Sequence, residues 1–165
     1  MTELTQARLK KLLHYEPETG VFTWKVRPSL KSRRRAGDVA GCRWNKPPRR
    51  VIGIDGTNYL AYRLAFLFMT GEFPLLGVDH KDTDPSNDAW DNLREASDEI
   101  NQQNRRRPSK KNRCGLLGVS KKRNGYCAQI SIDKKQTYIG TFDTPELAHA
   151  AYVAAKRIHH PGCTL

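Results

Sequence analysis

Four polar side chains within 23 residues have types and spacing that suit one reaction. Asp79 and His80 are adjacent, and Asn92 and Asn101 follow His80 at successive intervals of 12 and 9 residues. Carboxylate and carboxamide oxygens are ligands that Mg²⁺ accepts, with water and phosphate oxygens completing its octahedron. Imidazole titrates near neutral pH and can take a proton from an attacking water. The set suits hydrolysis of a phosphodiester, with Asp79 and Asn101 on the metal, His80 as general base, and Asn92 holding a loop or orienting His80.

The flanking residues indicate how these side chains are positioned. Val78-Asp79-His80 is typical of a strand end, and residues 81–88 are too rich in Asp, Asn and Pro for regular structure. Ser97 is the expected N-cap of a helix that begins near Asp98, which places Asn101 in its first turn. A strand end, a loop and a helix can therefore bring the four side chains together.

The residues before this segment predict further small elements. Leucines at positions 4, 9, 12 and 13 favour a short amphipathic helix that ends before a turn at 17–20. Val21–Val26 and Arg50–Asp55 have strand character. Tyr59–Thr70 favours a largely buried helix that stops at Gly71, and we expect its aromatic residues to lie in the core.

The sign of the charge changes twice along the chain. The 165 residues carry 29 Lys and Arg against 17 Asp and Glu, for a formal net charge of +12. Residues 1–60 hold 13 basic and 5 acidic side chains, residues 61–104 hold 3 and 9, and residues 105–165 hold 13 and 3. The overall balance indicates a polyanionic partner, most often nucleic acid. The acidic stretch is explained either by a bound cation or by a solvated face turned away from the nucleic acid.

Arg105–Arg113 is the expected boundary between two modules. Its sequence, RRRPSKKNR, has six basic residues in nine and no apolar side chain. We expect a linker or arm that lies along phosphate groups, and the alternative is a solvated loop without a partner. The predicted domains are residues 1–104, the linker 105–113, and residues 114–165. The phosphate-contacting candidates in the linker are Arg105, Arg106, Arg107, Lys110, Lys111 and Arg113.

Regular alternation after the linker predicts an antiparallel meander over Leu117–Lys122, Tyr126–Asp133 and Gln136–Thr141. A helix should follow, with Thr144 as N-cap and Pro145 at its first position. The helical residues expected to pack on the sheet are Leu147, Ala150, Ala151, Ala154 and Ile158. The polar face of the sheet carries Ser120, Lys122, Cys127, Gln129, Ser131, Gln136 and Tyr138. Such a face either enters a major groove or is merely solvated.

The segment Tyr59–Arg106 resembles a known family. Its VDH, DNLR and N-x-x-N elements stand in the order found in HNH nucleases of the ββα-metal type, close to phage and intron-encoded homing endonucleases. The resemblance implies that His80 is the general base and that Asn92 supports the loop, which makes these two the catalytic candidates. It also implies that Asp79 and Asn101 bind Mg²⁺ or Mn²⁺. Many members have His where this chain has Asn101, a change that favours oxygen ligation.

Residues 115–159 resemble a second family, the ethylene-response-factor (Apetala-two) DNA-binding domain of plants. The resemblance is carried by GV, YCAQI, IGTFDT and AHAAY. It implies that the polar sheet face meets DNA, although Ser120, Ser131, Gln136 and Tyr138 replace arginines and a tryptophan that are usual in the plant domain. The DNA-binding candidates in this part of the chain are Lys122, Arg123, Gln129, Ser131, Gln136 and Tyr138.

Composition excludes several classes of protein. The length suits one domain or two small modules, which excludes a large multi-domain enzyme. The longest apolar run, Leu64–Met69, is far shorter than the ~18 residues needed to span a bilayer, and the N-terminus has no signal-peptide core. We expect a protein of the cytoplasm of a bacterial or phage-infected cell. Because the four cysteines form no CxxC pair, a structural zinc site is not expected. Disulfides are not expected either, because the sequence shows no secretory context.

Together these observations predict a two-module DNA endonuclease of the α+β class, with double-stranded DNA as partner and a monomer favoured. Metal-assisted hydrolysis would leave a 5′-phosphate and a 3′-hydroxyl. The alternative is a non-catalytic regulator that binds DNA through the C-terminal sheet and retains an inactive HNH fold. An RNA-binding protein has less support, because the sequence lacks a base-stacking aromatic signature.

Overall fold

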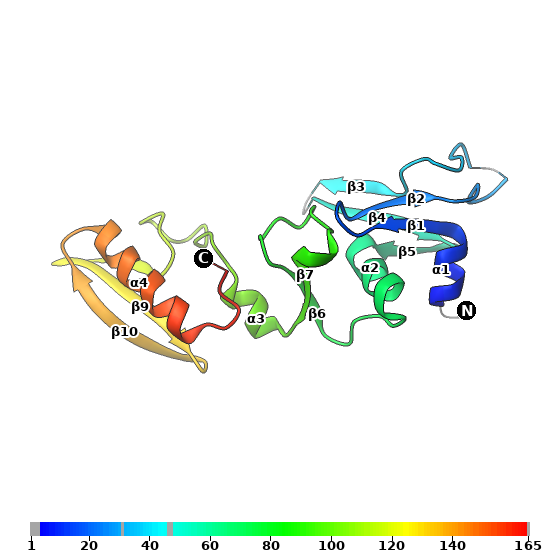
Figure 1. Ribbon diagram of the computed structural model, residues 1–165. Coiled ribbons are helices and arrows are strands. Elements are labelled where there is room, and N and C mark those ends of the chain that lie inside the picture. The colour runs from blue at the N-terminus through cyan, green and yellow to red at the C-terminus, as the bar shows by residue number, and fades with distance from the viewer. Residues whose placement is uncertain (1–3, 31, 46–47, 165) are drawn as a thin grey trace. The chain divides into compact units, whose positions relative to one another are not determined.

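The structure is a computed structural model that describes residues 4–30, 32–45 and 48–164. It is a mixed α/β protein whose described part has four α-helices and several small antiparallel sheets (Figure 1). The chain divides into two compact units, Met1–Ser97 and Asp98–Leu165. The domain ranges expected from the sequence, with a linker over 105–113, stay a prediction. No helix among the described residues is long and apolar enough to cross a membrane.

The first unit begins with α1 (Gln6–Leu12), which Thr5 caps by accepting a hydrogen bond from the Arg8 N–H. The leucine pattern predicted a helix that includes Leu13, but Leu13 begins β1 (Leu13–Glu16). This strand pairs antiparallel with β2 (Val21–Trp24). Leu13 and Tyr15 are buried while the residues between and after them are exposed, so strand alternation places both side chains in the core.

A three-stranded sheet and one helix complete the core of the first unit. The strands are β3 (Cys42–Asn45), β4 (Pro48–Ile54) and β5 (Thr57–Leu60), and β4 lies between the other two. Helix α2 (Ala61–Thr70) buries six of its residues. It ends at Gly71, whose φ of +93° suits glycine and whose N–H donates to the Leu67 carbonyl.

The hairpin that carries the candidate site consists of β6 (Gly77–His80) and β7 (Leu93–Ala96). A short 3₁₀ turn, η1 (Trp90–Asn92), leads into β7. In the antiparallel register Asp79 is opposite Arg94, and His80 is opposite Leu93. The sequence predicted β6 but not β7, because the four residues of β7 follow a loop rather than a recognisable turn signal.

The second unit contains α3 (Asp98–Gln103), the strands β8 (Val119–Lys122), β9 (Gly125–Ile132) and β10 (Lys135–Phe142), and α4 (Pro145–His159). The sheet order is β10-β9-β8, so β8 is an edge strand, and α4 packs on the sheet (Figure 1). Thr144 caps α4 as predicted, through its side-chain oxygen. The register places the predicted polar set on one face, namely Ser120, Lys122, Cys127, Gln129, Ser131, Gln136 and Tyr138.

The predicted packing face of α4 is wrong. Leu147 is 54% exposed and Ile158 is 76% exposed, and Ala150 and Ala154 are exposed as well. The buried residues of the helix are Ala148, Tyr152 and Lys156. The predicted set of packing residues and the observed set of buried residues both have helical spacing and are offset by about one residue. Periodicity alone therefore does not choose between these two faces of the helix. Tyr152 decides the orientation, because its ring packs against Gly118, where a Cβ would lie only 2.0 Å from Tyr152 Cδ2.

Candidate active site

His80 is the last residue of β6 and is only 6% exposed. Its Nε2 lies 3.0 Å from Oδ1 of Asp88, which is also buried. A carboxylate only accepts hydrogen bonds, so the imidazole donates through Nε2 in this pair. The arrangement fixes the tautomer and the ring orientation of the imidazole. The sequence reasoning placed Asp88 at the end of a loop and gave no signal that it contacts His80.

The β1–β2 hairpin holds Asp88 in place. Tyr15 Oη donates to the Asp88 carbonyl at 2.7 Å, and the Trp90 N–H donates to the Pro17 carbonyl at 2.8 Å. Gly20 has a φ of +71°, and a Cβ there would lie 2.2 Å from the Asp88 carbonyl carbon. Burial raises the pKa of Tyr15, and the negative charge of Asp88 raises it further, so the phenol stays protonated and donates.

Asn92 braces the loop between the two strands. Its Nδ2 donates to Asp82 Oδ1 at 3.0 Å and to the Asn87 carbonyl at 2.8 Å, and its Oδ1 accepts from the Asp82 N–H at 3.0 Å. Burial by itself would raise the pKa of Asp82. Hydrogen bonds from Asn87, from the Asp84 backbone and from Asn92 outweigh burial and hold that pKa below its usual range. The loop is therefore organised around an ionised Asp82.

Asp79 is 7% exposed and lies opposite Arg94 in the β6–β7 register. Arg94 donates through Nε at 2.9 Å and through Nη2 at 2.7 Å to Asp79 Oδ2. The predicted metal ligand therefore shares its carboxylate with a guanidinium. The sequence placed Arg94 in the DNLR element, but the register that pairs it with Asp79 depends on how the intervening loop closes.

Asn101 lies on α3, which belongs to the second unit, and its predicted partnership with Asp79 stays a prediction. In the part of the chain that the structure describes, no group of three or more His, Cys, Asp or Glu could hold a metal ion. Mg²⁺ usually takes only one or two protein carboxylates together with waters and phosphate oxygens. The buried carboxylate of Asp79 fits that donor chemistry.

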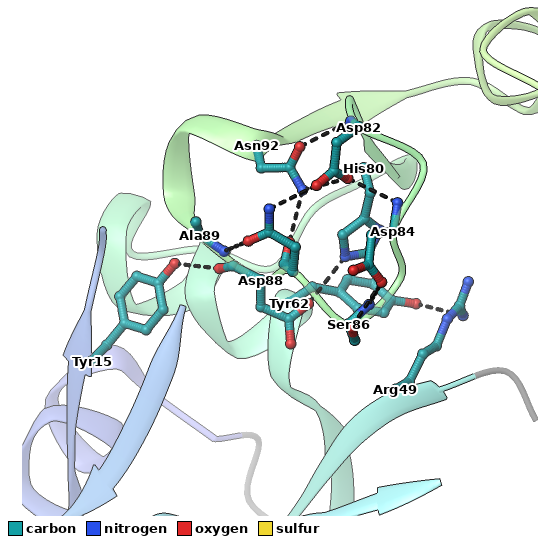
Figure 2. A network of polar contacts seen from close by, with 11 residues as sticks. Tyr15, Arg49, Tyr62, His80, Asp82, Asp84, Ser86, Asp88, Ala89 and Asn92 are labelled. Carbon is teal, nitrogen blue, oxygen red and sulfur yellow. Dashed lines mark hydrogen bonds and ion pairs between the residues drawn. The ribbon is translucent and has the colours of Figure 1, made fainter. Parts of the chain in front are cut away.

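The ring of Tyr62 contacts both the His80 imidazole and the Arg49 guanidinium. The ring of Tyr62 meets His80 edge to face, with centroids 5.5 Å apart and an interplanar angle of 82°. Arg49 Nη1 donates to Tyr62 Oη at 3.2 Å, and its guanidinium carbon lies 5.3 Å from the centre of the same ring. Figure 2 shows these three side chains, with Tyr62 between His80 and Arg49 in the series of contacts. Sequence reasoning missed both residues, because they lie in elements far from the VDH motif.

The basic segment 105–113 is attached to the second unit at several points. The Arg105 carbonyl accepts from Lys156 Nζ at 2.6 Å, and Arg106 Nη2 donates to the Thr164 carbonyl and hydroxyl at 3.0 and 2.7 Å. Asn112 donates through Nδ2 to the carbonyls of Leu116 and Val119. Hydrogen bonds of backbone carbonyls, the Arg106 guanidinium and one amide side chain therefore fix this segment although it has no apolar residues, and its predicted role as a linker along phosphate groups stays a prediction.

The remaining DNA-binding candidates of the second unit lie at its surface. Gln129 is half-buried, and all the others are exposed, namely Arg105, Arg106, Arg107, Lys110, Lys111, Arg113, Lys122, Arg123, Ser131, Gln136 and Tyr138. Tyr138 Oη lies 2.9 Å from Thr141 Oγ1 on the same strand. Cys127 lies on the polar face by register but is buried, and all four cysteines are free thiols. The face is thus accessible, with amide and hydroxyl groups at its surface.

Comparison with family models finds a match to part of the chain. Residues 59–103 match the family model described as HNH endonuclease, and this range includes Asp79, His80, Asn92 and Asn101. The match supports a nuclease that acts on DNA, and it covers a minority of the chain. No curated protein and no solved structure matches the chain. The C-terminal resemblance to the plant DNA-binding domain stays a prediction.

Proposed function

We propose that the protein is a DNA endonuclease that hydrolyses phosphodiester bonds with one divalent metal and with His80 as its general base. The buried His80–Asp88 pair carries this proposal, because it lies at a strand end inside the segment that matches the HNH family. A carboxylate behind an imidazole orients it and stabilises the imidazolium that forms when it takes a proton. The pair is thus equipped for proton transfer from water.

Each residue of the hairpin has a part in this proposal. His80 Nδ1 accepts the proton of the attacking water while Asp88 holds Nε2–H. Asn92 keeps the loop closed through its three side-chain hydrogen bonds and so acts as a positioning residue. Asp79 would hold the metal, and the Arg94 pair fixes the direction of its carboxylate. A bound Mg²⁺ or Mn²⁺ would polarise the phosphate and stabilise the leaving 3′-oxygen.

Arg49 is a candidate for contact with the scissile phosphate. Among the described hydrogen bonds of its guanidinium, only Nη1 is engaged, by Tyr62 Oη. Its Nε is buried and has no hydrogen-bond partner among the described residues. The positive charge of the guanidinium attracts an anionic phosphate oxygen. Because Arg49 is bonded to Tyr62, whose ring packs against His80, Arg49 would help to draw phosphate toward the hairpin that carries His80.

The second unit would position the enzyme on duplex DNA. Its polar sheet face presents Gln129, Gln136 and Tyr138, groups that can meet base edges in a major groove. The resemblance to a plant DNA-binding domain supports this assignment, and the resemblance of the first unit to phage homing endonucleases supports action in a bacterial cytoplasm.

The test is cleavage of supercoiled plasmid by the full chain with Mg²⁺ or Mn²⁺, beside a chelator control. We expect cutting with metal only. His80→Ala should lower the rate by about 10²–10⁴-fold. His14→Ala, which alters an exposed histidine, is the matched control and should cut normally. DNA binding measured with chelator should be the same for all three proteins. Full cutting by His80→Ala would remove the proposed base, and no cutting by the wild type with either metal would favour a non-catalytic DNA-binding regulator.

A further inference from the structure

The second unit contains an open cavity of about 1060 Å³ beside the edge strand β8. Its walls come from the segment before β8, from β8 itself, from the β8–β9 turn, and from Tyr126 and Pro145. Five of the lining residues are cations, and none is Asp or Glu. The cations are Lys111, Arg113, Lys121, Lys122 and Arg123. All lie within one unit of the chain, and all are exposed.

A folded framework gathers these charges. Asn112, between two of them, donates to the carbonyls of Leu116 and Val119 at 2.8 and 3.1 Å and accepts from the Cys114 N–H at 2.8 Å. Gly118, which directly precedes β8, has a φ of +76° and lies under the ring of Tyr152. The segment before β8, which forms part of the cavity wall, is therefore fixed by hydrogen bonds and by packing against Tyr152. A preformed site loses less conformational entropy when it binds a ligand than a mobile arm would.

The five side chains differ from two other cations of the same unit. Arg106 and Lys156 donate hydrogen bonds to groups of the protein. In the described part of the chain, none of the five cavity side chains takes part in a hydrogen bond or an ion pair. Like charges around one cavity repel one another, and here no acidic lining residue offsets the repulsion. A polyanion is therefore the complementary ligand.

We propose that this cavity binds the phosphodiester backbone of duplex DNA, as a phosphate site at the β8 edge of the sheet that shares Lys122 with the polar face. The inference rests on the proposed DNA-binding function and adds to it where the backbone runs. Lys121 is opposite Tyr126 in the register, so it lies on the helix side of β8 and not on the polar face. Alternation alone would leave Lys121 out of DNA binding, whereas the cavity includes it. The backbone accordingly crosses the β8 edge of the sheet.

The opposite end of the sheet provides a matched control. Lys134 and Lys135 lie at the β9–β10 turn, are exposed and are not lining residues of the cavity. Strand β9 separates this turn from the β8–β9 turn by about 25 Å, given ~3.4 Å per residue. Lys134 and Lys135 carry the same charge as the cavity residues Lys121 and Arg123, so the two pairs differ in position. If DNA bound to any basic surface of the protein, both pairs would contribute to binding. If DNA binds at the cavity, only Lys121 and Arg123 of these four residues contribute.

The experiment measures binding of a short fluorescent duplex by the full chain in chelator, over a series of salt concentrations. The double variant Lys121→Gln/Arg123→Gln should lower the magnitude of the slope of log K against log salt by about 1–2 units, and weaken binding roughly tenfold at moderate salt. The loss should be the same for duplexes of unrelated sequence, because phosphate contacts carry no sequence information. Lys134→Gln/Lys135→Gln should bind like the wild type.

Three results would overturn the proposal: a cavity variant with the wild-type slope, an equal loss in both double variants, or a preference for RNA over duplex DNA in competition. Circular dichroism of the variants checks that the exposed substitutions leave the fold intact. Failure of the nuclease is a separate result, because binding is measured without metal. If the wild type fails to cut while the cavity variant alone loses its salt dependence, the phosphate site stands and the hydrolytic function falls.

Discussion

The acidic loop between β6 and β7 and the basic cavity beside β8 arrange charge in opposite ways. In the loop, the carboxylates of Asp82, Asp84 and Asp88 all accept hydrogen bonds from neighbouring groups of the same unit. In the cavity, five cations lie together and none makes a hydrogen bond within the described residues. Both regions are held by a folded framework, so the contrast lies in how their charges are satisfied.

The contrast indicates two different tasks. A charge that is hydrogen-bonded inside the fold keeps one position, which suits the orientation of a group that transfers a proton. A charge left to solvent exchanges its counterions, which suits reversible binding of a polyanion. We therefore expect substitutions in the loop to alter the rate of cleavage and substitutions in the cavity to alter DNA binding.

The largest effect is expected from Asp88→Asn. An amide can donate to Nε2 of His80, which favours the tautomer with the proton on Nδ1 and removes the base. Single-turnover cleavage should fall by about 10²–10⁴-fold while DNA binding in chelator is unchanged. Asp91→Asn is the control, because Asp91 is an exposed carboxylate of the same loop region and should cleave normally. Equal losses in both variants would mean that only the charge of the loop matters.

Gly20→Ala should have an intermediate effect, on the stability of the first unit. The substitution imposes a positive φ on alanine and places Cβ against the Asp88 carbonyl carbon. We expect the free energy of unfolding to fall by about 2–4 kcal/mol. Urea denaturation followed by tryptophan fluorescence reports on this unit, since Trp24, Trp44 and Trp90 all belong to it.

Gly56→Ala separates strain from the clash. Gly56 also has a positive φ, of +83°, but nothing lies within 4 Å of a Cβ there. Its loss should be about 1–2 kcal/mol, from backbone conformation alone. If Gly20→Ala is no worse than Gly56→Ala, the hairpin does not press on Asp88, and the loop is less fixed than the contrast with the cavity requires.

The smallest effect is expected from Lys156→Met, which tests a cation of the second unit that the fold has enclosed. Burial lowers the pKa of Lys156, and the charge of Arg106 lowers it further, while Cys163 opposes both. The folded state thus holds this proton more weakly than the unfolded state. The lysine costs stability at neutral pH, and that cost is relieved as pH rises from the lowered pKa toward the ordinary value of 10.5.

Hydrogen exchange of the β9 amides in both proteins measures that difference. The stability of the wild type relative to Lys156→Met should rise as pH approaches the ordinary lysine pKa. A difference that stays constant or falls with pH would show that Lys156 is stabilised as a cation. Lys156 would then be a charge that the fold stabilises, like the carboxylates of the β6–β7 loop. The contrast between the buried Lys156 and the exposed cations of the cavity would not hold.

Local patterns predicted much of the second unit. Alternation located the strands of its sheet and their polar face, and the Thr144-Pro145 pair located the start of α4. The packing face of α4 was wrong because two stripes share helical spacing, and only the fit of Tyr152 over Gly118 selects one. Strand β7 was missed because its residues gain a partner only when the loop before it closes.

The candidate site divides in the same way. Residue type and order pointed to Asp79, His80 and Asn92 before any fold was considered. Their partners were not predictable from order, because Asp88, Arg94 and Tyr62 meet them through strand register and helix packing. Arg49 reaches the site from another sheet through Tyr62. Sequence therefore names chemically reactive groups more readily than the groups that orient them.

One measurement compares the two regions directly: single-turnover cleavage of one duplex at saturating protein, together with its binding constant across salt, for Asp88→Asn and for Lys121→Gln/Arg123→Gln. We predict that the first variant loses the saturating rate and keeps the salt slope of binding, and that the second keeps the rate and loses slope. If both variants change both quantities alike, the oriented imidazole and the phosphate site do not have separate tasks in this protein, and the proposed division between the loop and the cavity is contradicted.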